Sequence, residues 1–268
     1  MTAANTVRSG LSADSIILQA KKLHKNFGGV NAVADISFEI TSGNVFAIIG
    51  PNGAGKSTLL NLISGVYQPS SGSLNFGGRN LAGVRAHERV RLGLARTFQK
   101  IRLFKQLSVL ENVIAGFHIH HAIPAWQYIY HGEAFRRDHD KCRDEAARLL
   151  KFVGMSLRTH DLAGALSYGE QRMLELARAL ATKPRLLLID EPAAGLNSAE
   201  VDLLLDRIRA VRQEGITVVV VEHNMDLVMN VADRIMVMDY GKCLFEGEPT
   251  EVQKNPAVIA AYLGGELS

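Results

Sequence analysis

A glycine-rich segment carries the clearest chemistry in this chain. It consists of Gly50, Pro51, Asn52, Gly53, Ala54, Gly55, Lys56, Ser57 and Thr58, and is called the P-loop below. The pattern G-x-x-x-x-G-K-[ST], between an apolar run and a helix start, is typical of loops whose backbone N–H groups wrap phosphates. Lys56 is then expected to reach the β- and γ-phosphates, and the Ser57 hydroxyl to bind Mg²⁺. The segment predicts a nucleoside triphosphate site.

Two carboxylates follow a second apolar run, 186–189. Ligand sites in open α/β sheets lie at the carboxyl ends of the strands, so Asp190 is expected near the magnesium ion. Glu191 is then placed to orient and deprotonate an attacking water. The structural alternative is an acidic, solvent-facing turn before Pro192.

A third candidate is the segment 166–170, which precedes a run with helical spacing of Met173 and Leu176. Ser167 and Glu170 have the S-x-x-E spacing of a capping box, so they could simply begin a core helix. A helix N-terminus with a serine hydroxyl and a bare glycine, here Gly169, is also an anion site that could receive a γ-phosphate. Both interpretations stay open from these residues alone.

The elements that must position these residues alternate between strands and helices, which predicts an α/β core with a largely parallel sheet. Helices are expected from Lys56, from Ser198 and over 225–232, and strands and a hairpin at 35–40, 45–49, 186–189, 216–221, 235–238 and 243–245. The stretch from about 96 to 165 lacks strand runs and is interpreted as an inserted helical subdomain. Residues 1–15 have the composition of a flexible tail, which leaves 16–268 as a single domain.

Composition and charge disfavour several function classes, although a local basic patch stays possible. The chain of 268 residues is 47% hydrophobic with a net charge of +3, which gives little support to nucleic-acid binding by bulk charge. No apolar run reaches the roughly 18–20 residues that span a bilayer. A membrane role would therefore depend on partner proteins.

In this order, the motifs resemble the ATP-binding-cassette (ABC) ATPase family over nearly the whole chain. The resemblance implies a P-loop NTPase core with a mainly parallel sheet, an antiparallel β portion and an inserted helical subdomain, with ATP and Mg²⁺ bound. It implies that Phe27 stacks on adenine, that Gln99 contacts Mg²⁺ or the attacking water, and that His223 contacts the γ-phosphate. It also implies that a second chain's ATP is contacted by Ser167, Gly169 and Glu170. Taken alone, Phe27 and His223 would more often be structural.

The sequence departs from the family pattern at two places. The family's Leu-Ser-Gly-Gly-Gln is Leu-Ser-Tyr-Gly-Glu here, with Tyr168 and Glu170 as the changes. Asn197 stands where an aspartate is often found, and could equally be the N-cap of the next helix. These changes leave open whether two identical chains would form two equivalent sites.

Narrower similarities connect the chain with the ATPases of branched-chain amino-acid importers. They lie at 96–104, 107–113, 166–172, 193–197 and 258–264. The resemblance implies a second ATPase chain (related or identical), two transmembrane permease subunits and, indirectly, a periplasmic binding protein, with the chain peripheral at the cytoplasmic face of the inner membrane. ATPases of urea importers and lipopolysaccharide exporters share much of this pattern. A soluble ABC ATPase that acts on nucleic acid or the ribosome is the alternative from another class; the single cassette and modest charge disfavour it.

Two further segments suggest hypotheses. Leu103 and Phe104 are expected to form part of a groove for a short helix of a membrane subunit. The stretch 118–139 is rich in histidine and could hold a metal, but the spacing favours an ordinary helical surface. Its histidines are His118, His120, His121, His131 and His139.

Overall fold

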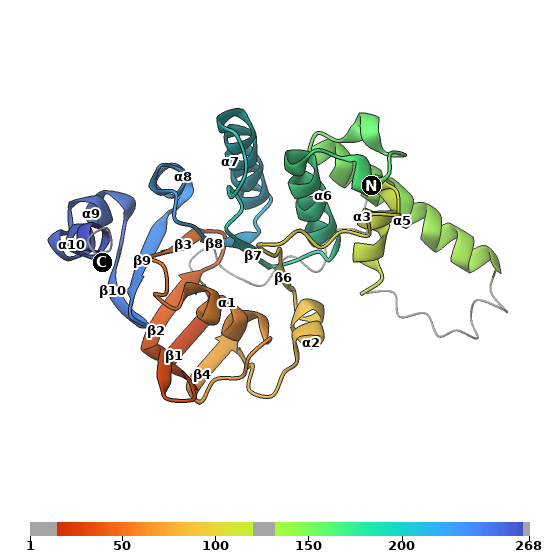
Figure 1. Cartoon of the computed structure of the whole chain (residues 1–268). Helices are drawn as coiled ribbons and strands as arrows, with labels where there is room; N and C mark the ends of the chain where they lie inside the picture. Colours follow the sequence, from red (N-terminus) through yellow and green to blue (C-terminus); the bar gives the residue numbers. More distant parts are fainter. Residues whose placement is uncertain (1–14, 120–131, 265–268) are drawn as a thin grey trace.

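Two sheets and surrounding helices make up the computed structural model, which describes residues 15–119 and 132–264 (Figure 1). The larger sheet has six strands in the order β10-β9-β3-β8-β7-β6. These are β3 (Val45–Ile49), β6 (Leu94–Arg96), β7 (Leu186–Asp190), β8 (Thr217–Val221), β9 (Arg234–Asp239) and β10 (Lys242–Gly247). Its pairings are parallel except for β9 with β10, which is an antiparallel hairpin. The predicted parallel core and hairpin are confirmed.

The central strands β3, β7 and β8 are buried at every position, as expected for parallel strands covered on both faces. Alternate residues of β3 enter two different cores because successive side chains of a strand point to opposite faces. Val45, Ala47 and Ile49 pack with the larger helices, whereas Phe46 and Ile48 pack with α1 and the second sheet. The strand that leads into the P-loop is thus fixed from both sides.

The second sheet has four antiparallel strands in the order β2-β1-β4-β5. They are β1 (Ile16–Phe27), β2 (Val30–Thr41), β4 (Ser71–Phe76) and β5 (Arg79–Asn80). The half-buried strand expected at 35–40 lies within β2. The sequence did not reveal β1, because several register shifts in its pairing with β2 interrupt the alternation of apolar and polar residues.

Helices cover both sheets, and those expected from Lys56, Ser198 and 225–232 are confirmed. They are α1 (Lys56–Ser64), α2 (Ala86–Arg91), α7 (Ser198–Gln213), α8 (Met225–Val231), α9 (Pro249–Lys254) and α10 (Pro256–Gly264). In the described residues, no helix is both long and apolar enough to span a bilayer.

A separate group of helices lies to one side of the sheets in Figure 1. It contains α3 (Val109–Phe117), α5 (Gly132–Phe152) and α6 (Tyr168–Ala181), which contact one another. Short 3₁₀ turns at Ser156–Arg158 and Ala163–Ala165 connect α5 to α6. Because α6 begins after residue 165 and still packs with α3 and α5, it belongs to the same contact group. The subdomain boundaries at 96 and 165 stay predictions.

Parts of two sequence hypotheses lie outside the described residues. Nearly all of the expected tail does, as do His120, His121 and His131, while His139 lies on α5 and only its backbone is described. His118 is exposed at the end of α3. Among the described residues, no cluster of three or more His, Cys, Asp or Glu side chains could hold a metal ion.

Candidate active site

The P-loop leaves β3 and enters α1 by a path that requires glycine at two positions. Gly50 and Gly55 have φ angles of 147° and 97°. A Cβ atom on Gly50 would lie 2.0 Å from the Met238 carbonyl oxygen, and one on Gly55 would lie 2.2 Å from the Ala32 carbonyl oxygen. Because both neighbours are backbone atoms of adjacent strands, a side chain at either position would displace the loop.

The first turn of α1 is prepared for an anion. Its N-cap, Gly55, provides no side-chain cap, and the turn contains no acidic residue. Lys56, only 7% exposed, donates from Nζ to the carbonyl oxygens of Gly50 at 2.7 Å and Pro51 at 2.9 Å. Burial lowers the pKa of Lys56, although Glu191 and Asp190 act in the opposite direction. Free backbone donors and a buried ammonium fit a phosphate group.

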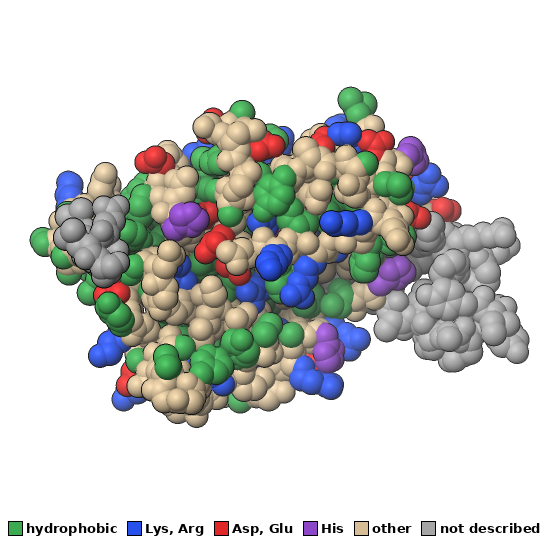
Figure 2. All heavy atoms as spheres, viewed as in Figure 1, with side chains coloured by type: hydrophobic (Ala, Val, Ile, Leu, Met, Phe, Trp, Pro, Cys, Tyr) green, Lys and Arg blue, Asp and Glu red, His purple; other side chains and the backbone are tan. Residues whose placement is uncertain are grey.

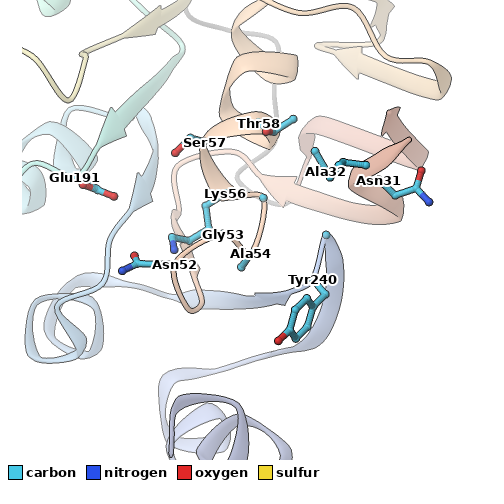
Figure 3. Close-up of a pocket in the computed structure, with 13 residues that line it drawn as sticks. Asn31, Ala32, Asn52, Gly53, Ala54, Lys56, Ser57, Thr58, Glu191 and Tyr240 are labelled. Atoms are coloured by element: carbon cyan, nitrogen blue, oxygen red, sulfur yellow. The ribbon is translucent and has the colours of Figure 1, made fainter. Parts of the chain in front are cut away.

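A cavity of about 360 Å³ opens beside this loop, and several of the sequence-predicted residues line it (Figure 3). Glu191 lies on one side of the loop and Tyr240 on another. The predicted residues in the lining are Asn52, Gly53, Ala54, Gly55, Lys56, Ser57, Thr58 and Glu191. The sequence analysis did not single out the other lining residues, which are Val30, Asn31, Ala32, Tyr240 and Gly241. They lie in two hairpins. The sequence predicted the hairpin that contains Tyr240 and Gly241, but no motif marks any of these residues as part of the site, so only the fold brings them there.

Asp190 is held by an arginine that the sequence analysis did not identify as part of the site. Arg96, at the end of β6, donates to Asp190 Oδ2 at 2.9 Å, and both side chains are more than nine-tenths buried. The same guanidinium donates to Asn61 Oδ1 at 2.7 Å and Ser64 Oγ at 2.8 Å, both on α1. Arg96 therefore connects the acidic end of β7 with the helix that begins at the P-loop.

Glu191 and Gln99 meet although 92 residues separate them. Gln99 Nε2 donates to Glu191 Oε2 at 2.6 Å. Glu191 has a left-handed φ of 45°, and its N–H donates to the Val221 carbonyl oxygen at 2.8 Å. A non-glycine residue in this conformation is strained, and such strain is common at functional sites.

Buried Glu222 shapes the other side of this region. Its carboxylate accepts from the backbone N–H groups of Ala193 at 2.8 Å, His223 at 2.9 Å and Asn224 at 3.2 Å. The carboxylate thereby connects the end of β8 with the turn after Glu191, a role that no local pattern indicates. The His223 side chain is 60% exposed beside this carboxylate, with Nδ1 3.7 Å from Glu222 Oε2.

Phe27 lies at the end of β1 and is not among the described residues that line the cavity. Its ring is 41% exposed and makes an edge contact with Tyr67, with ring centroids 5.2 Å apart. The Lys25 ammonium lies 4.9 Å from the Phe27 ring centroid. A base stacked on Phe27 would therefore extend beyond the described cavity.

Ser167, Gly169 and Glu170 occupy the start of α6 and are not among the described residues that line the P-loop cavity. Ser167 is the N-cap, and the capping box is confirmed: Glu170 N–H donates to Ser167 Oγ at 3.3 Å, and Ser167 N–H donates to Glu170 Oε2 at 2.8 Å. Arg158 donates to the other oxygen of Glu170. Burial raises the pKa of Glu170, but hydrogen bonds from the Ser167 backbone and Arg158 outweigh it, and the pKa is lowered.

Asn197 is the N-cap of α7. Its side chain accepts from Glu200 N–H at 3.0 Å, while Glu200 Oε2 accepts from Asn197 N–H at 3.0 Å. The structural interpretation of this departure from the family pattern is therefore confirmed.

Comparison with known proteins agrees with this geometry. Residues 33–194 match the family model described as ABC transporter. The chain belongs to the ABC transporter family. Residues 242–267 match a second model, branched-chain amino acid ATP-binding cassette transporter. As a family member the chain is an ABC-type ATPase, and the predicted fold class is confirmed.

Relatives and solved structures match almost the full length of the chain. The branched-chain amino acid transport ATP-binding protein BraF of Pseudomonas aeruginosa is 41% identical, with 92% of this chain and 98% of BraF covered. LivG of Escherichia coli, named for the same transport, is 37% identical with the same coverage. A nucleotide-free ATP-binding cassette of an ABC transporter has a TM-score of 0.81 at 30% identity, covering 92% of this chain and 99% of its own. The ADP conformation of MJ1267, another such cassette, also has a TM-score of 0.81, at 31% identity, and covers 93% and 99% of the two chains.

Proposed function

We propose that this chain is the ATP-hydrolysing subunit of an importer for branched-chain amino acids. The observation that carries the ATPase role is the meeting of Lys56, Ser57 and Glu191 around one cavity. The cargo is inferred from the similarity of the whole chain to BraF and LivG and from the match at 242–267.

In this proposal the P-loop holds the triphosphate. Lys56 exchanges its carbonyl contacts for the β- and γ-phosphates, and the N–H groups at the start of α1 donate to phosphate oxygens. Ser57 and Asp190, with Gln99, would hold Mg²⁺, whose chemistry is to neutralise developing phosphate charge. Arg96 holds the Asp190 carboxylate in a fixed direction through the 2.9 Å contact.

Glu191 acts as the general base toward the attacking water, and Gln99 orients its carboxylate through the 2.6 Å hydrogen bond. His223, largely exposed at the end of β8, would contact the γ-phosphate. Phe27 would stack on adenine, which requires the base to extend past the cavity toward the end of β1.

Ser167, Gly169 and Glu170 would contact the ATP of a second ATPase chain, either a related chain or an identical one. None of the three is among the described residues that line the cavity of their own chain, which supports this arrangement, since a site on another molecule is needed to use them. Two P-loops and two α6 helices would then close head to tail, and hydrolysis would release the closed dimer.

The chain would act at the cytoplasmic face of the inner membrane, bound to two permease subunits and, through them, indirectly coupled to a periplasmic binding protein. Exposed apolar side chains beside α3 support a docking surface for a permease helix: Phe104 is 54% exposed and Leu162 is 56% exposed, and Leu103 packs against the hydrophobic core. No nucleic acid is expected as a partner. Substituting Phe104 should reduce transport more than ATP hydrolysis.

The decisive experiment is Glu191→Gln in the full chain. The amide keeps the shape of the side chain but cannot accept the proton, so kcat should fall by about 100-fold or more while ATP still binds. Glu214→Gln, an exposed change at the end of α7, is the control and should retain full turnover. Turnover of Glu191→Gln close to the wild-type value would contradict the proposed base. Uptake of leucine and of urea by the assembled transporter would then test the cargo separately.

A further inference from the structure

Arg172 is a buried arginine on α6 that contacts the segment carrying Gln99. It is only 5% exposed. Its Nη1 donates to the Phe98 carbonyl oxygen at 2.8 Å, and its Nη2 donates to the Gln99 carbonyl oxygen at 2.6 Å. Two backbone acceptors in succession are thus held by one rigid, planar group, which restricts both the position and the direction of this segment.

Glu175, one helical turn further along α6, completes the contact. Its Oε2 accepts from Arg172 Nη1 at 3.2 Å, and its Oε1 accepts from Phe98 N–H at 3.3 Å. The ion pair is almost fully buried, with side chains 4% and 3% exposed. The backbone of Phe98 is therefore held at both its N–H and its carbonyl oxygen by two side chains of one helix.

Tyr168 contacts both Arg172 and the turn that follows Glu191. Arg172 Nη2 donates to the Tyr168 hydroxyl at 3.0 Å, and the guanidinium lies 5.4 Å from the ring centroid. The Tyr168 ring also lies against Gly195: a Cβ atom there would be 3.1 Å from Tyr168 Cε1. Tyr168, one of the residues that depart from the family pattern, thus contacts both Arg172 and the segment between β7 and α7.

We propose that Arg172 is a positioning residue for ATP hydrolysis. Arg172, near the start of α6, holds the backbone carbonyl oxygens of Phe98 and Gln99. It thereby determines where the Gln99 side chain lies relative to the Glu191 carboxylate. A change in the position of α6 would be transmitted to the base through one guanidinium. The inference rests on the proposed role of Glu191 as the general base. The contacts of Arg172 with the Phe98 and Gln99 backbone do not depend on that role.

The physical reason is the shortness of the connection. Only the Gln99 side chain lies between the backbone carbonyl that Arg172 holds and the carboxylate of Glu191. A displacement of the Gln99 backbone is therefore passed directly to the 2.6 Å hydrogen bond, and small displacements of positioned groups have large effects on rate.

The test removes the arginine without leaving a buried charge. Arg172→Met alone would leave Glu175 unpaired and could unfold the chain, so the main variant is Arg172→Met/Glu175→Gln. Its kcat should fall by about tenfold, with the dissociation constant of ATP changed by less than about twofold. Arg172→Lys with Glu175 intact should recover part of the loss, because one donor and the charge remain.

A matched control separates positioning from general damage to α6. Arg178→Met removes another, partly buried arginine of the same helix, whose guanidinium lies over the Phe104 ring, and keeps the Arg172–Glu175 pair intact. Hydrogen exchange of the amides at 97–102 in the nucleotide-free chain should be faster in the Arg172 variant by about fivefold or more and unchanged in the control.

Combination with Gln99→Ala gives the second readout. If Arg172 acts through Gln99, adding the Arg172 variant to Gln99→Ala should cause no further loss of kcat. Independent, multiplicative losses, or unchanged exchange at 97–102, would overturn the proposal. Normal turnover of Glu191→Gln would instead refute the proposed base, and the exchange data would still show whether Arg172 holds this segment.

Discussion

Two helix N-termini of this protein, at α1 and at α6, carry serine and glycine, yet their backbone N–H groups differ in whether they are free to bind an anion. At α1, the N-cap Gly55 offers no side chain to the first turn, and that turn has no acidic residue. At α6, Ser167 and Glu170 satisfy each other's backbone N–H groups. The start of α1 therefore has backbone donors available for an anion, whereas the start of α6 is already occupied by its own side chains.

This difference shows how the two helix starts of a shared site can differ in how readily they bind phosphate. A phosphate at α1 meets free donors and a buried ammonium. A phosphate at the start of α6 is repelled by the negative charge of Glu170, and the positive charge of Arg158 offsets this repulsion. Binding in the P-loop should consequently be strong in a single chain, and contact with α6 should require a second chain to present the phosphate.

The largest effect is expected from Lys56→Ala. Loss of a buried, charged donor to phosphate should weaken ATP binding by about 3 kcal/mol, or about 100-fold in dissociation constant. Titration of the full chain with ATP measures this. Lys254→Ala on the exposed end of α9 is the control. An ATP affinity within a few-fold of wild type would show that the N-termini of α1 and α6 differ less in anion binding than their capping residues suggest.

Ser167→Ala should act on stability and leave ATP binding by the same chain unchanged. Loss of this N-cap should lower the free energy of unfolding by about 1 kcal/mol, which urea denaturation measures. Asn197→Ala at α7 is a matched cap deletion and should cost a similar amount. A clear loss of ATP affinity in the isolated Ser167→Ala chain would mean that α6 contacts its own P-loop site.

Arg158→Gln tests whether Glu170 needs its counter-charge. Without Arg158, the Glu170 carboxylate should repel the incoming phosphate, so closure of the ATP-loaded dimer should weaken by about threefold. Measurement of dimer formation in the Glu191→Gln background would show this. Adding Glu170→Gln should restore closure, because the repelling charge is then gone; failure of this rescue would contradict the electrostatic explanation.

The smallest effect concerns pH. The pKa of Glu170 is lowered from its ordinary value of 4.5, since hydrogen bonds from Ser167 and Arg158 outweigh the opposing effect of burial. The stability that this ionised group contributes is present above pH 4.5 and is lost as the pH falls through the lowered pKa. Between about pH 6 and about pH 4, wild type should therefore lose more unfolding free energy than Glu170→Gln. Equal losses would show that the carboxylate is not stabilised in the folded state.

Much of the fold could be predicted because buried parallel strands are short apolar runs bounded by distinct residues. The runs at 45–49, 186–189 and 216–221 correspond to β3, β7 and β8. The strand β1 could not be predicted, because its irregular pairing breaks the two-residue period. The position of α6 among α3 and α5 also depends on packing between distant segments.

The sequence by itself determined three local features: the P-loop with its required glycines, the acidic pair at the end of β7, and the capping box at α6. Each depends on neighbours within a few residues, so its pattern is visible in the chain. The tertiary structure decided that Arg96 holds Asp190, that Gln99 meets Glu191, and that Arg172 holds the backbone beside Gln99. These contacts join residues far apart in sequence, and their formation depends on where packed strands and helices bring long side chains together.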